Sequence, residues 1–294
     1  MTRALVALLL LAGCTPGPER RTAACAPLRG IGDPIDRSAM VWVPGGTTVI
    51  GSDAFHAEEA PKRRVQVNGF WIDQHEVTNA EFGAFAKATG YRTVNERKGG
   101  GAVFRSPDAI ASLEDVTQWW SFEPRATWRL PHGPAGAPAQ QAMPVVQITY
   151  ADALAYARWR KRDLPTEVEW ERAARGGIAD AEYSWGNQPR SDQPRANYWQ
   201  GVFPLRDAGG DGYKGVAPVG CFRPNGYGLY DMAGNVWELT SAIWSKGSQA
   251  RVIKGGSWLC ADSFCLRYRP AARQPADRDM GTDHIGFRTV LRTP

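Results

Sequence analysis

The chain has 294 residues, of which 43% are hydrophobic and 22% are charged, an ordinary balance for a globular protein. The 35 Lys and Arg side chains outnumber the 30 Asp and Glu side chains. No dense basic block or nucleic-acid-binding motif accompanies this excess, so the composition argues against nucleic-acid binding. Gly and Pro are frequent, at 32 and 21, and are spread along the chain. They predict a fold rich in loops, in which the 12 Trp side chains fill an irregular core.

Residues 1–13 have the features of an export signal. A short basic start precedes an apolar run over residues 4–11, which is too short to span a bilayer. The sequence Leu11-Ala12-Gly13-Cys14 then resembles a bacterial lipobox, and the alternative is an ordinary secretory signal cleaved nearby. We therefore expect an exported, membrane-anchored lipoprotein, periplasmic or on the cell surface. It would be lipidated on Cys14 and would contact the membrane only through that anchor.

The remainder of the chain divides into a linker and a folded part. Residues 14–38 are rich in Pro, Gly, Ala and Arg without apolar periodicity, which predicts a flexible tether. No later apolar run reaches the length of about 18 residues that a membrane helix needs. Residues 39–294 show no internal repeat or convincing boundary, so we predict a single domain there.

Short strands and three helices are predicted within this domain. An apolar strand at Met40–Val43 ends at a Pro-Gly pair, and residues 65–72 alternate as a second strand. Three helices of about 10 to 13 residues, with no fourth, are expected where a threonine precedes a carboxylate by three positions. These starts are Thr78 with Glu81, Thr149 with Asp152, and Thr166 with Glu169.

The other segments are predicted to be irregular. Residues 91–148 contain several Pro and a Gly-Gly-Gly run, and they predict a long loop that is functional or wraps the core. From residue 176 onward, short apolar runs alternate with Gly, Asn, Asp and Pro, which predicts a meander of short antiparallel strands. The predicted class is therefore one α+β domain with little regular secondary structure.

Signatures of several common enzyme classes are missing. The four histidines are His56, His75, His132 and His284, and none has the spacing of a His-Glu-x-x-His zinc site. No nucleophile elbow, P-loop or dinucleotide-binding glycine motif in its βαβ context is found. A zinc hydrolase, a serine hydrolase of that type and a nucleotide-binding enzyme are therefore unsupported.

The cysteines carry most of the chemical information. With Cys14 lipidated, four cysteines remain, and an oxidising compartment permits disulfides among them. Four cysteines allow three complete pairings, so sequence alone permits both a Cys25–Cys221 and a Cys260–Cys265 bridge. Zinc needs four ligands, for which no second pair is suitably spaced, whereas two thiolates suit Cu(I). For Cys260 and Cys265 a disulfide and a copper site both stay open.

Two Gly-rich clusters carry oxygen ligands of the kind that Ca²⁺ takes. The first joins Asn197-Tyr198-Trp199 with Asp211-Gly212-Tyr213, and the second runs from Asp231 to Glu238. Asx-turns without an ion explain the same residues, and on the residues alone they are the stronger reading. A bound Ca²⁺ would hold loops that have little regular structure of their own.

From about Met40 to Val290 the chain resembles the formylglycine-generating enzyme (sulfatase-modifying factor) family. The resemblance implies an irregular α+β domain that is distantly similar to C-type lectins. The segments that carry it include His75-Glu76-Val77-Thr78-Asn79, Ala126-Thr127-Trp128-Arg129, Leu164-Pro165-Thr166-Glu167, Ala196-Asn197-Tyr198-Trp199-Gln200-Gly201, Asn225-Gly226-Tyr227-Gly228-Leu229-Tyr230, Gly234-Asn235-Val236-Trp237-Glu238, the segment from Ser257 to Cys265, and Gly286-Phe287-Arg288.

This resemblance implies a reaction and a copper site. The family reaction oxidises a cysteine in a Cys-x-Pro-x-Arg segment of a sulfatase to formylglycine, with O₂ as the oxidant. Cys260 and Cys265 have the spacing of active members, which implies that they hold Cu(I). Ser257 occupies the position of the active-site serine. Trp237 would form a wall of the substrate site, and Glu76 would bind the arginine of the substrate.

The resemblance also implies two calcium sites and shows one departure. The calcium ligands are Asn197, Asp211 and the carbonyls of Tyr198 and Tyr213 at the first site, and Asp231, Glu238 and the carbonyls of Gly234 and Val236 at the second. The family loop that helps to bind the substrate arginine has an acidic residue where this chain has Gly99-Gly100-Gly101. The recognition sequence of this chain therefore need not match that of the family.

Two other functions compete with the copper oxidase. A non-catalytic, lipid-anchored scaffold of the same fold would bind protein or glycan and would not need reduced cysteines. A related iron-dependent sulfur-transfer enzyme would need an extra helical domain with clustered His, which this chain lacks. The state of Cys260 and Cys265 separates the oxidase from the scaffold.

Overall fold

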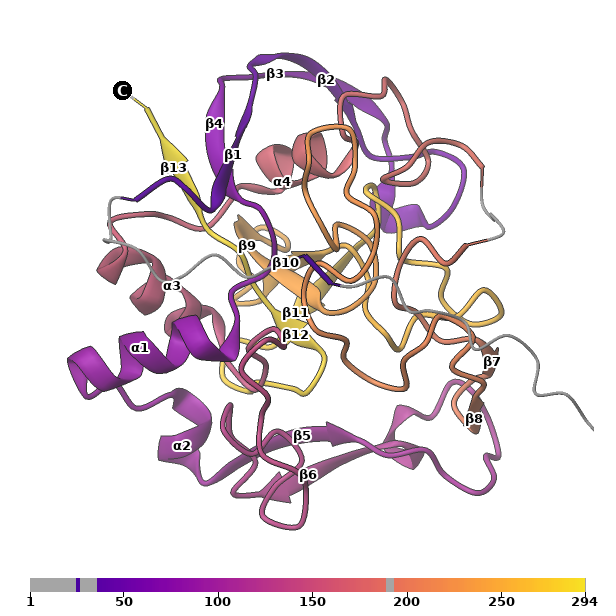
Figure 1. Ribbon diagram of the computed structural model, residues 1–294. Helices are drawn as coiled ribbons and strands as arrows, with labels where there is room; N and C mark the ends of the chain where they lie inside the picture. Colours follow the sequence, from indigo (N-terminus) through magenta and orange to yellow (C-terminus); the bar gives the residue numbers. More distant parts are fainter. Residues whose placement is uncertain (1–24, 27–35, 189–192, 294) are drawn as a thin grey trace, which may run out of the picture.

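The computed structural model describes residues 25–26, 36–188 and 193–293 (Figure 1). Short strands and a few short helices surround a central sheet, as expected for an α+β domain with little regular structure. The predicted signal, Cys14 and most of the predicted tether lie outside the described residues. Within the described part, no helix is both long and apolar enough to span a bilayer. The likeness to C-type lectins stays a prediction.

Two sheets form the frame of the domain. One has the strand order β1-β4-β13, with antiparallel pairs throughout, so the end of the chain returns beside its first strands. The other has the order β11-β10-β9-β12 and lies at the centre of Figure 1. The strands are β1 (Met40–Val43), β4 (Phe70–Asp73), β9 (Trp237–Ile243), β10 (Arg251–Lys254), β11 (Arg273–Ala276), β12 (Ile285–Gly286) and β13 (Val290–Arg292).

The expected antiparallel meander is wrong in one respect. Strand β12 pairs with β9 in parallel, with Ile285 opposite Trp237. This pairing places the segment before β13 beside the strand that carries Trp237. Three two-stranded pairs complete the sheets, together with the 3-10 turns η1 (Ala57–Glu59) and η2 (Val116–Gln118). The pairs are β2 (Gly46–Ile50) with β3 (Arg63–Val67), β5 (Gly100–Phe104) with β6 (Trp120–Pro124), and β7 (Gly201–Val202) with β8 (Arg206–Asp207).

The strand expected at residues 65–72 is two strands. β3 ends at Val67 and pairs with β2, whereas β4 starts at Phe70 and pairs with β1. Gly69 lies between them against the indole of Trp42, where a Cβ atom would clash with the ring. The chain changes partner at this glycine, which an alternating apolar pattern does not reveal.

All three expected helices form. α1 (Asn79–Thr89) ends at Gly90, and α3 (Tyr150–Trp159) and α4 (Glu167–Ala174) follow the other two threonines. The expectation of no fourth helix is wrong, because α2 (Val94–Lys98) begins at Thr93 with the same capping box, completed by Glu96. Together with the β5–β6 hairpin, α2 also replaces much of the loop expected over residues 91–148.

The buried side chains form three clusters that position the cysteines. The main cluster packs α1 and α3 against Phe287 and includes both Cys260 and Cys265. A second cluster joins α4 to the β1-β4-β13 sheet around Trp170. The third is aromatic and contains Phe104, Trp199, Phe203 and Trp258. The segment 257–265 therefore crosses from the aromatic cluster into the main core.

A disulfide joins Cys25 to Cys221, one of the bridges that the sequence permits. Beside it, the backbone N–H of Ala26 donates to the carbonyl of Gly220 at 2.8 Å. The predicted tether is therefore fastened to the domain at this point.

Breaking this bridge should lower stability without disturbing the other two cysteines. We expect the double variant Cys25→Ser/Cys221→Ser to lose about 2–4 kcal/mol of unfolding free energy, because the bridge closes a long loop in the unfolded chain. Urea denaturation of the variant and of the parent protein measures the loss. An unchanged urea midpoint would contradict a structural role for the bridge.

Candidate active site

Cys260 and Cys265 lie on a tight turn that follows β10. The N–H of Cys260 donates to the carbonyl of Ser257 at 2.9 Å, and the N–H of Cys265 donates to that of Ala261 at 3.2 Å. Gly256 enters the turn with φ +74°, and a Cβ there would approach the carbonyl of Arg267 to 2.7 Å. A glycine is therefore required at this position, and the turn it allows buries both thiols as free cysteines.

The two thiols affect each other's ionisation. Burial raises the pKa of Cys260 well above its usual value, and the neighbouring Cys265 raises it further. A hydrogen bond from Cys260 lowers the pKa of Cys265. Cys260 therefore donates a hydrogen bond that favours the thiolate form of Cys265 over that of Cys260. Cysteine binds metals and undergoes redox chemistry mainly as the thiolate.

The segment 56–59 holds the cysteine turn from outside. A ring nitrogen of His56, Nε2, lies 2.8 Å from the carbonyl oxygen of Cys265. Glu58 pairs with Arg267 at 2.5 Å, and Glu59 forms a buried two-point pair with Arg269 at 2.9 and 2.5 Å. The sequence does not predict these contacts, because the partners lie far apart in the chain and no local pattern connects them. They fix the backbone on the C-terminal side of the thiol pair.

The structure buries both Ser257 and Trp237. Ser257 is fully buried in the same turn, where its Oγ accepts from the N–H of Leu259 at 3.3 Å. Trp237 opens β9 and belongs to the same apolar cluster as the cysteines. Its backbone N–H donates to the carbonyl of His284 at 2.9 Å. Ser257 is therefore buried within the cysteine turn, and Trp237 is buried in the large apolar cluster that also includes both cysteines.

Glu76 lies deeper than a substrate-binding residue would. It is fully buried, and its Oε1 accepts from Asn235 at 3.0 Å, whereas its Oε2 has no partner. Burial, followed by the nearby charge of Asp231, raises its pKa well above the usual value. As placed, Glu76 contacts Asn235 and does not lie on an open surface where a substrate arginine could bind.

The glycine run that departs from the family pattern lies in β5 and just before it. Gly100 and Gly101 are buried. A Cβ on Gly100 would collide with the carbonyl of Glu123, and one on Gly101 would collide with the side chains of Asn95 and Gln147. These two positions have no room for an acidic side chain, so any carboxylate that recognises the substrate must come from elsewhere.

The first predicted calcium cluster contains a carboxylate without a cation. Asp211 accepts from the N–H of Tyr198 at 3.1 Å and from that of Tyr213 at 2.9 Å. Burial nevertheless raises its pKa to about 6. Asn197 lies nearby in sequence and donates its amide to Gly215 and Asn235. A buried carboxylate that lacks a positive partner fits a site for a cation.

The second predicted cluster is also rich in buried negative charge. Asp231 accepts from the N–H of Gly220 at 2.6 Å, and burial raises its pKa to about 6. Glu238 is differently engaged, because both of its oxygens accept from Arg288 at 2.7 Å and one also accepts from Trp170 at 2.7 Å. In this structure the Glu238 carboxylate therefore holds the buried arginine, which does not fit its predicted role as a calcium ligand.

Gly234 and Val236, the other two predicted members of the second cluster, lie in the buried loop between Asp231 and Glu238. Gly234 has φ +73°, and a Cβ there would clash with the carbonyl of Asn197. The N–H of Asn235 in turn donates to this carbonyl at 2.8 Å. The loop therefore packs directly against the first cluster, so the two predicted calcium regions are neighbours.

These acidic side chains give a pH-dependent prediction. The folded-state pKa values of Asp211 and Asp231 lie above their ordinary value of 3.8, at about 6, so the folded state binds more protons between these limits. Without calcium, stability should therefore fall as the pH rises from about 4 to about 7. Added Ca²⁺ should raise the melting temperature more at about pH 7.5 than at about pH 5. Melting curves in chelator that match those in Ca²⁺ at both pH values would contradict bound calcium.

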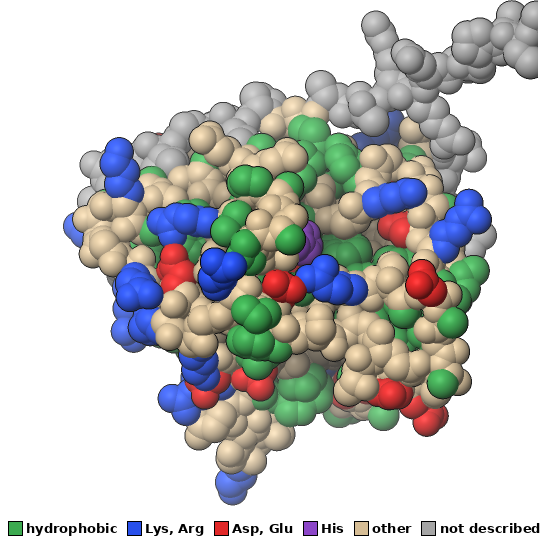
Figure 2. Space-filling view, turned by 90° about the horizontal axis from the view of Figure 1, so that it is seen from below, with side chains coloured by type: hydrophobic (Ala, Val, Ile, Leu, Met, Phe, Trp, Pro, Cys, Tyr) green, Lys and Arg blue, Asp and Glu red, His purple; other side chains and the backbone are tan. Residues whose placement is uncertain are grey.

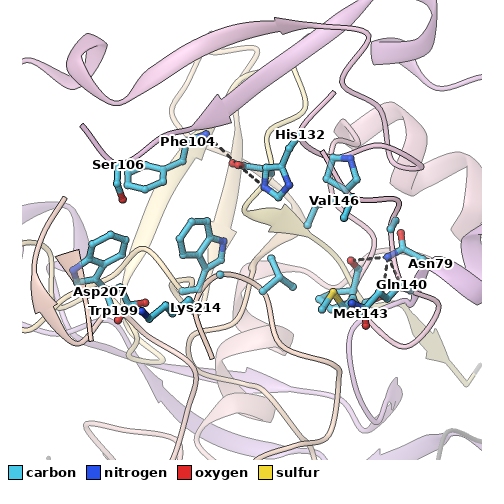
Figure 3. Close-up of a pocket in the computed structure, with 18 of the residues that line it drawn as sticks. Asn79, Phe104, Ser106, His132, Gln140, Met143, Val146, Trp199, Asp207 and Lys214 are labelled. Carbon is cyan, nitrogen blue, oxygen red and sulfur yellow. Dashed lines mark hydrogen bonds and ion pairs between the residues drawn. The ribbon is translucent and has the colours of Figure 1, made fainter. Parts of the chain in front are cut away.

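A cleft of 610 Å³ borders the cysteine turn. Figure 3 shows His132 between one side of the cleft, with Asp207, Trp199 and Lys214, and the other, with Asn79 and Met143. Trp199 and Trp258 line the cleft, and the N–H of Trp199 donates to the carbonyl of Cys260 at 2.9 Å. The backbone of Trp199, whose side chain lines the cleft, is thus hydrogen-bonded to the backbone of a predicted copper ligand.

Comparisons with known proteins show what the chain is similar to. The model of the sulfatase-modifying factor enzyme 1-like domain matches residues 33–293. The chain is 45% identical to the formylglycine-generating enzyme of Thermomonospora curvata, over 85% of this chain and 92% of the relative. It is 43% identical to the inactive C-alpha-formylglycine-generating enzyme 2 of Mus musculus, over 85% and 84%.

The fold has a relative among the solved structures. PvdO from Pseudomonas aeruginosa superposes with a TM-score of 0.64 at 24% identity, covering 89% of this chain and 97% of that one. This likeness concerns the fold alone. Because the family model spans nearly the whole described domain and the sequence relatives cover most of both chains, the protein belongs to the family of sulfatase-modifying factor enzyme 1-like domains.

Proposed function

We propose that this protein is a copper-dependent oxidase that converts the cysteine of a Cys-x-Pro-x-Arg segment in a sulfatase to formylglycine with O₂. The observation that carries the proposal is which cysteines form a disulfide and which remain free. Cys25 and Cys221 are bridged, whereas Cys260 and Cys265 lie together as free thiols. A relative that is 45% identical is named a formylglycine-generating enzyme.

Cys260 and Cys265 would hold Cu(I), because two adjacent thiolates are soft ligands that suit it. When bound, Cu(I) would supply the one-electron chemistry that O₂ needs to react with a thiol. In the overall reaction the substrate CH₂–SH becomes an aldehyde and its sulfur leaves as H₂S. Half of the electrons that reduce O₂ to water come from the substrate, and half come from a thiol reductant.

The residues of the chain have separate tasks in this proposal. The hydrogen bond from Cys260 lowers the pKa of Cys265, which favours the thiolate form that binds metal. Ser257, fully buried in the same turn, would supply a hydroxyl that holds a proton. The apolar cluster that contains Trp237 and both cysteines would exclude water from the sulfur atoms. Exclusion of water limits side reactions of activated oxygen.

Calcium and membrane anchoring belong to the same proposal. The buried carboxylates Asp211 and Asp231 would each contribute to a Ca²⁺ site that braces the loops around Asn197 and Gly234, without Glu238, which Arg288 holds. Export and lipidation at Cys14 rest on the amino-terminal sequence alone. The Cys25–Cys221 bridge supports an oxidising compartment, because structural disulfides persist in exported proteins.

The direct test is aldehyde formation. We expect the full chain, loaded with copper and supplied with O₂ and a thiol reductant, to convert a Cys-x-Pro-x-Arg peptide to its aldehyde, as detected by mass spectrometry. A matched peptide with Ser in place of Cys should stay unchanged. Recovery of unaltered Cys peptide, under conditions in which a known formylglycine-generating enzyme reacts, would refute the proposal.

A non-catalytic anchored scaffold is the second candidate. The observation that favours it is a 43% identical relative whose name states that it is inactive. The scaffold predicts that Cys260 and Cys265 oxidise to a stable bridge and take up no copper. Thiol titration after mild reduction, with and without Cu(I), distinguishes the two functions.

A further inference from the structure

Four aromatic rings form a continuous stack in the part of the core that contains the two free thiols. The ring centroids of Tyr198 and Tyr268 lie 4.3 Å apart, those of Tyr268 and Tyr183 lie 5.9 Å apart, and those of Tyr183 and Trp185 lie 5.1 Å apart. The planes of successive rings differ by only 18°, 28° and 11°. Most other ring pairs among the described residues are tilted or edge-to-face, so this series of stacked rings stands apart.

One end of the stack lies at the cysteine turn. Tyr268 is 2% exposed, belongs to the buried cluster that contains Cys260 and Cys265, and follows Cys265 by three residues. Its hydroxyl donates to Asp262, which lies between the two cysteines in the turn. Tyr198 and Asp262 both line a hollow of 390 Å³ on this turn. Because three residues of chain span at most about 11 Å, Tyr268 lies close enough to the thiol pair for direct electron transfer.

The other end of the stack reaches the surface. Tyr183 is 2% exposed, whereas Trp185 is only partly buried. The indole N–H of Trp185 donates to the carbonyl of Gln188 at 2.8 Å in an exposed contact. The N–H of Tyr183 donates to the carbonyl of Gly186 at 2.9 Å, and that of Gly186 donates back at 3.1 Å, so a short loop fixes both rings. The stack therefore joins the cysteine turn to the surface through aromatic rings alone.

The two buried phenols of the stack each have a carboxylate beside the hydroxyl. Burial, followed by the hydrogen bond to Asp262, raises the pKa of Tyr268 well above its usual value. Burial, followed by the charge of Glu182 and a hydrogen bond to it, raises the pKa of Tyr183 to about 12. Both phenols are therefore uncharged at neutral pH. An uncharged phenol that loses an electron also releases its proton, and here each proton has a hydrogen-bonded acceptor in place.

The proposed reaction needs electrons that its substrate does not supply, because half of those that reduce O₂ come from a thiol reductant. Cys260 and Cys265 are only 2% and 8% exposed, so a reductant has little direct contact with them. Figure 2 shows charges of both signs interspersed with hydrophobic groups on the face of the β5–β6 hairpin, so this face does not attract a charged reductant. A path through the protein would deliver electrons even while a substrate segment covers the site.

We propose that the four stacked rings are a relay that carries single electrons from a thiol reductant at Trp185 to the thiol-pair site. The inference rests on the proposed function. In each passage Tyr268 gives an electron to the site and its proton to Asp262, and it recovers both when Tyr183 supplies the next electron. Trp185 then refills Tyr183, and the reductant refills Trp185. Tyr198 extends the relay to the hollow on the cysteine turn.

Two passages balance the reaction. Two thiols each lose one electron and one proton and join as a disulfide, while the rings and carboxylates return to their starting state. The two delivered electrons and the two that the substrate cysteine loses reduce one O₂ to the level of water. The relay therefore adds no oxidant or reductant to the proposed reaction.

The test interrupts the relay and keeps the stack. Tyr183→Phe retains the ring but removes the phenol, and phenylalanine is not oxidised under these conditions. Turnover is measured with a small dithiol and with the same dithiol coupled to dextran, which is too large to approach the buried thiols. We expect Tyr183→Phe to lose most of its aldehyde formation with the dextran-linked dithiol and to keep the parent rate with the small one. Parent rates with both reductants would overturn the inference.

Matched variants distinguish electron transfer from a structural effect. Tyr156 is also 2% exposed and lies in the same cluster but outside the stack, so Tyr156→Phe should keep the parent rate with both reductants. Trp185→Phe should behave like Tyr183→Phe. Trp185→Tyr, which can still be oxidised, should recover the rate with the dextran-linked dithiol. A Trp185→Tyr variant as slow as Trp185→Phe would count against the relay.

A second readout needs neither copper nor turnover. A pulse of azide radicals oxidises tryptophan side chains, and tyrosines within the same molecule then refill them, which absorbance follows. In the copper-free full chain we expect the yield of tyrosyl radicals to fall in Tyr183→Phe but not in Tyr156→Phe. Equal yields in the two variants would overturn the relay. If no peptide yields aldehyde, the proposed function fails, and this measurement still tests the relay.

Discussion

Cys265→Ser should abolish aldehyde formation while the protein stays folded. Serine is close to cysteine in size, so the buried turn keeps its hydrogen bonds, but the hydroxyl is not ionised at neutral pH and is a poor ligand for Cu(I). Changes next to metal ligands commonly cost about 10–100-fold in activity, and we expect the loss of a ligand itself to cost more. Peptide turnover measured by mass spectrometry checks the activity, and circular dichroism checks the fold.

The disulfide provides a matched control for this variant. Cys25→Ser/Cys221→Ser also replaces thiols by hydroxyls, but it leaves the Cys260–Cys265 pair intact. We expect this double variant to be less stable and yet active below its melting temperature. Activity in Cys265→Ser at the parent level would exclude the thiol pair from the reaction.

Arg288→Met should produce the largest loss of stability. Arg288 is fully buried and donates to both oxygens of Glu238, to the carbonyl of Asp73 at 3.2 Å and to that of Tyr230 at 2.9 Å. Methionine fills part of the volume but leaves the Glu238 carboxylate buried without a cation. Breaking a buried pair in this way costs about 3–5 kcal/mol, and the nearby charge of Asp231 adds to the penalty. Urea denaturation measures the loss.

An exposed arginine is the control for Arg288. Arg278 lies near the surface and approaches Asp279 only to 4.0 Å, so Arg278→Met should change stability by less than about 0.5 kcal/mol. Adding Glu238→Gln to Arg288→Met should recover part of the loss, because it removes the unpaired charge. If Arg288→Met costs as little as Arg278→Met, the buried pair is not a major source of stability.

Sequence predicted the features that local chemistry determines. A threonine followed three positions later by a carboxylate begins each of the three expected helices, and Gly90 ends the first. The same signature at Thr93 and Glu96 was missed because α2 is a single short turn without an apolar stripe. Helix caps can be predicted from the sequence because both hydrogen-bonding partners lie within one turn of the chain.

Long-range partners were much harder to predict. The parallel pairing of β12 with β9, the Arg288–Glu238 ion pair and the contact of His56 with Cys265 join residues far apart in sequence. Nothing in a local pattern states which carboxylate a buried arginine will meet. Glu238 was therefore expected at a calcium ion, whereas the structure pairs it with Arg288.

The thiol pair was partly predictable. The spacing of Cys260 and Cys265 indicated a joint role, but it could not decide between a bridge and two free thiols. The turn at Gly256 and the Glu59–Arg269 pair fix the backbone around them. Both are properties of the folded chain.

The central claim is that Cys260 and Cys265 remain reduced and bind one cuprous ion together. Its most direct measurement is the copper retained per chain after the reduced full-length protein is titrated with Cu(I) against a coloured chelator. We predict one copper per parent chain and none in Cys260→Ser. Recovery of a chain without copper, with Cys260 and Cys265 joined by a disulfide after this titration, would contradict the account.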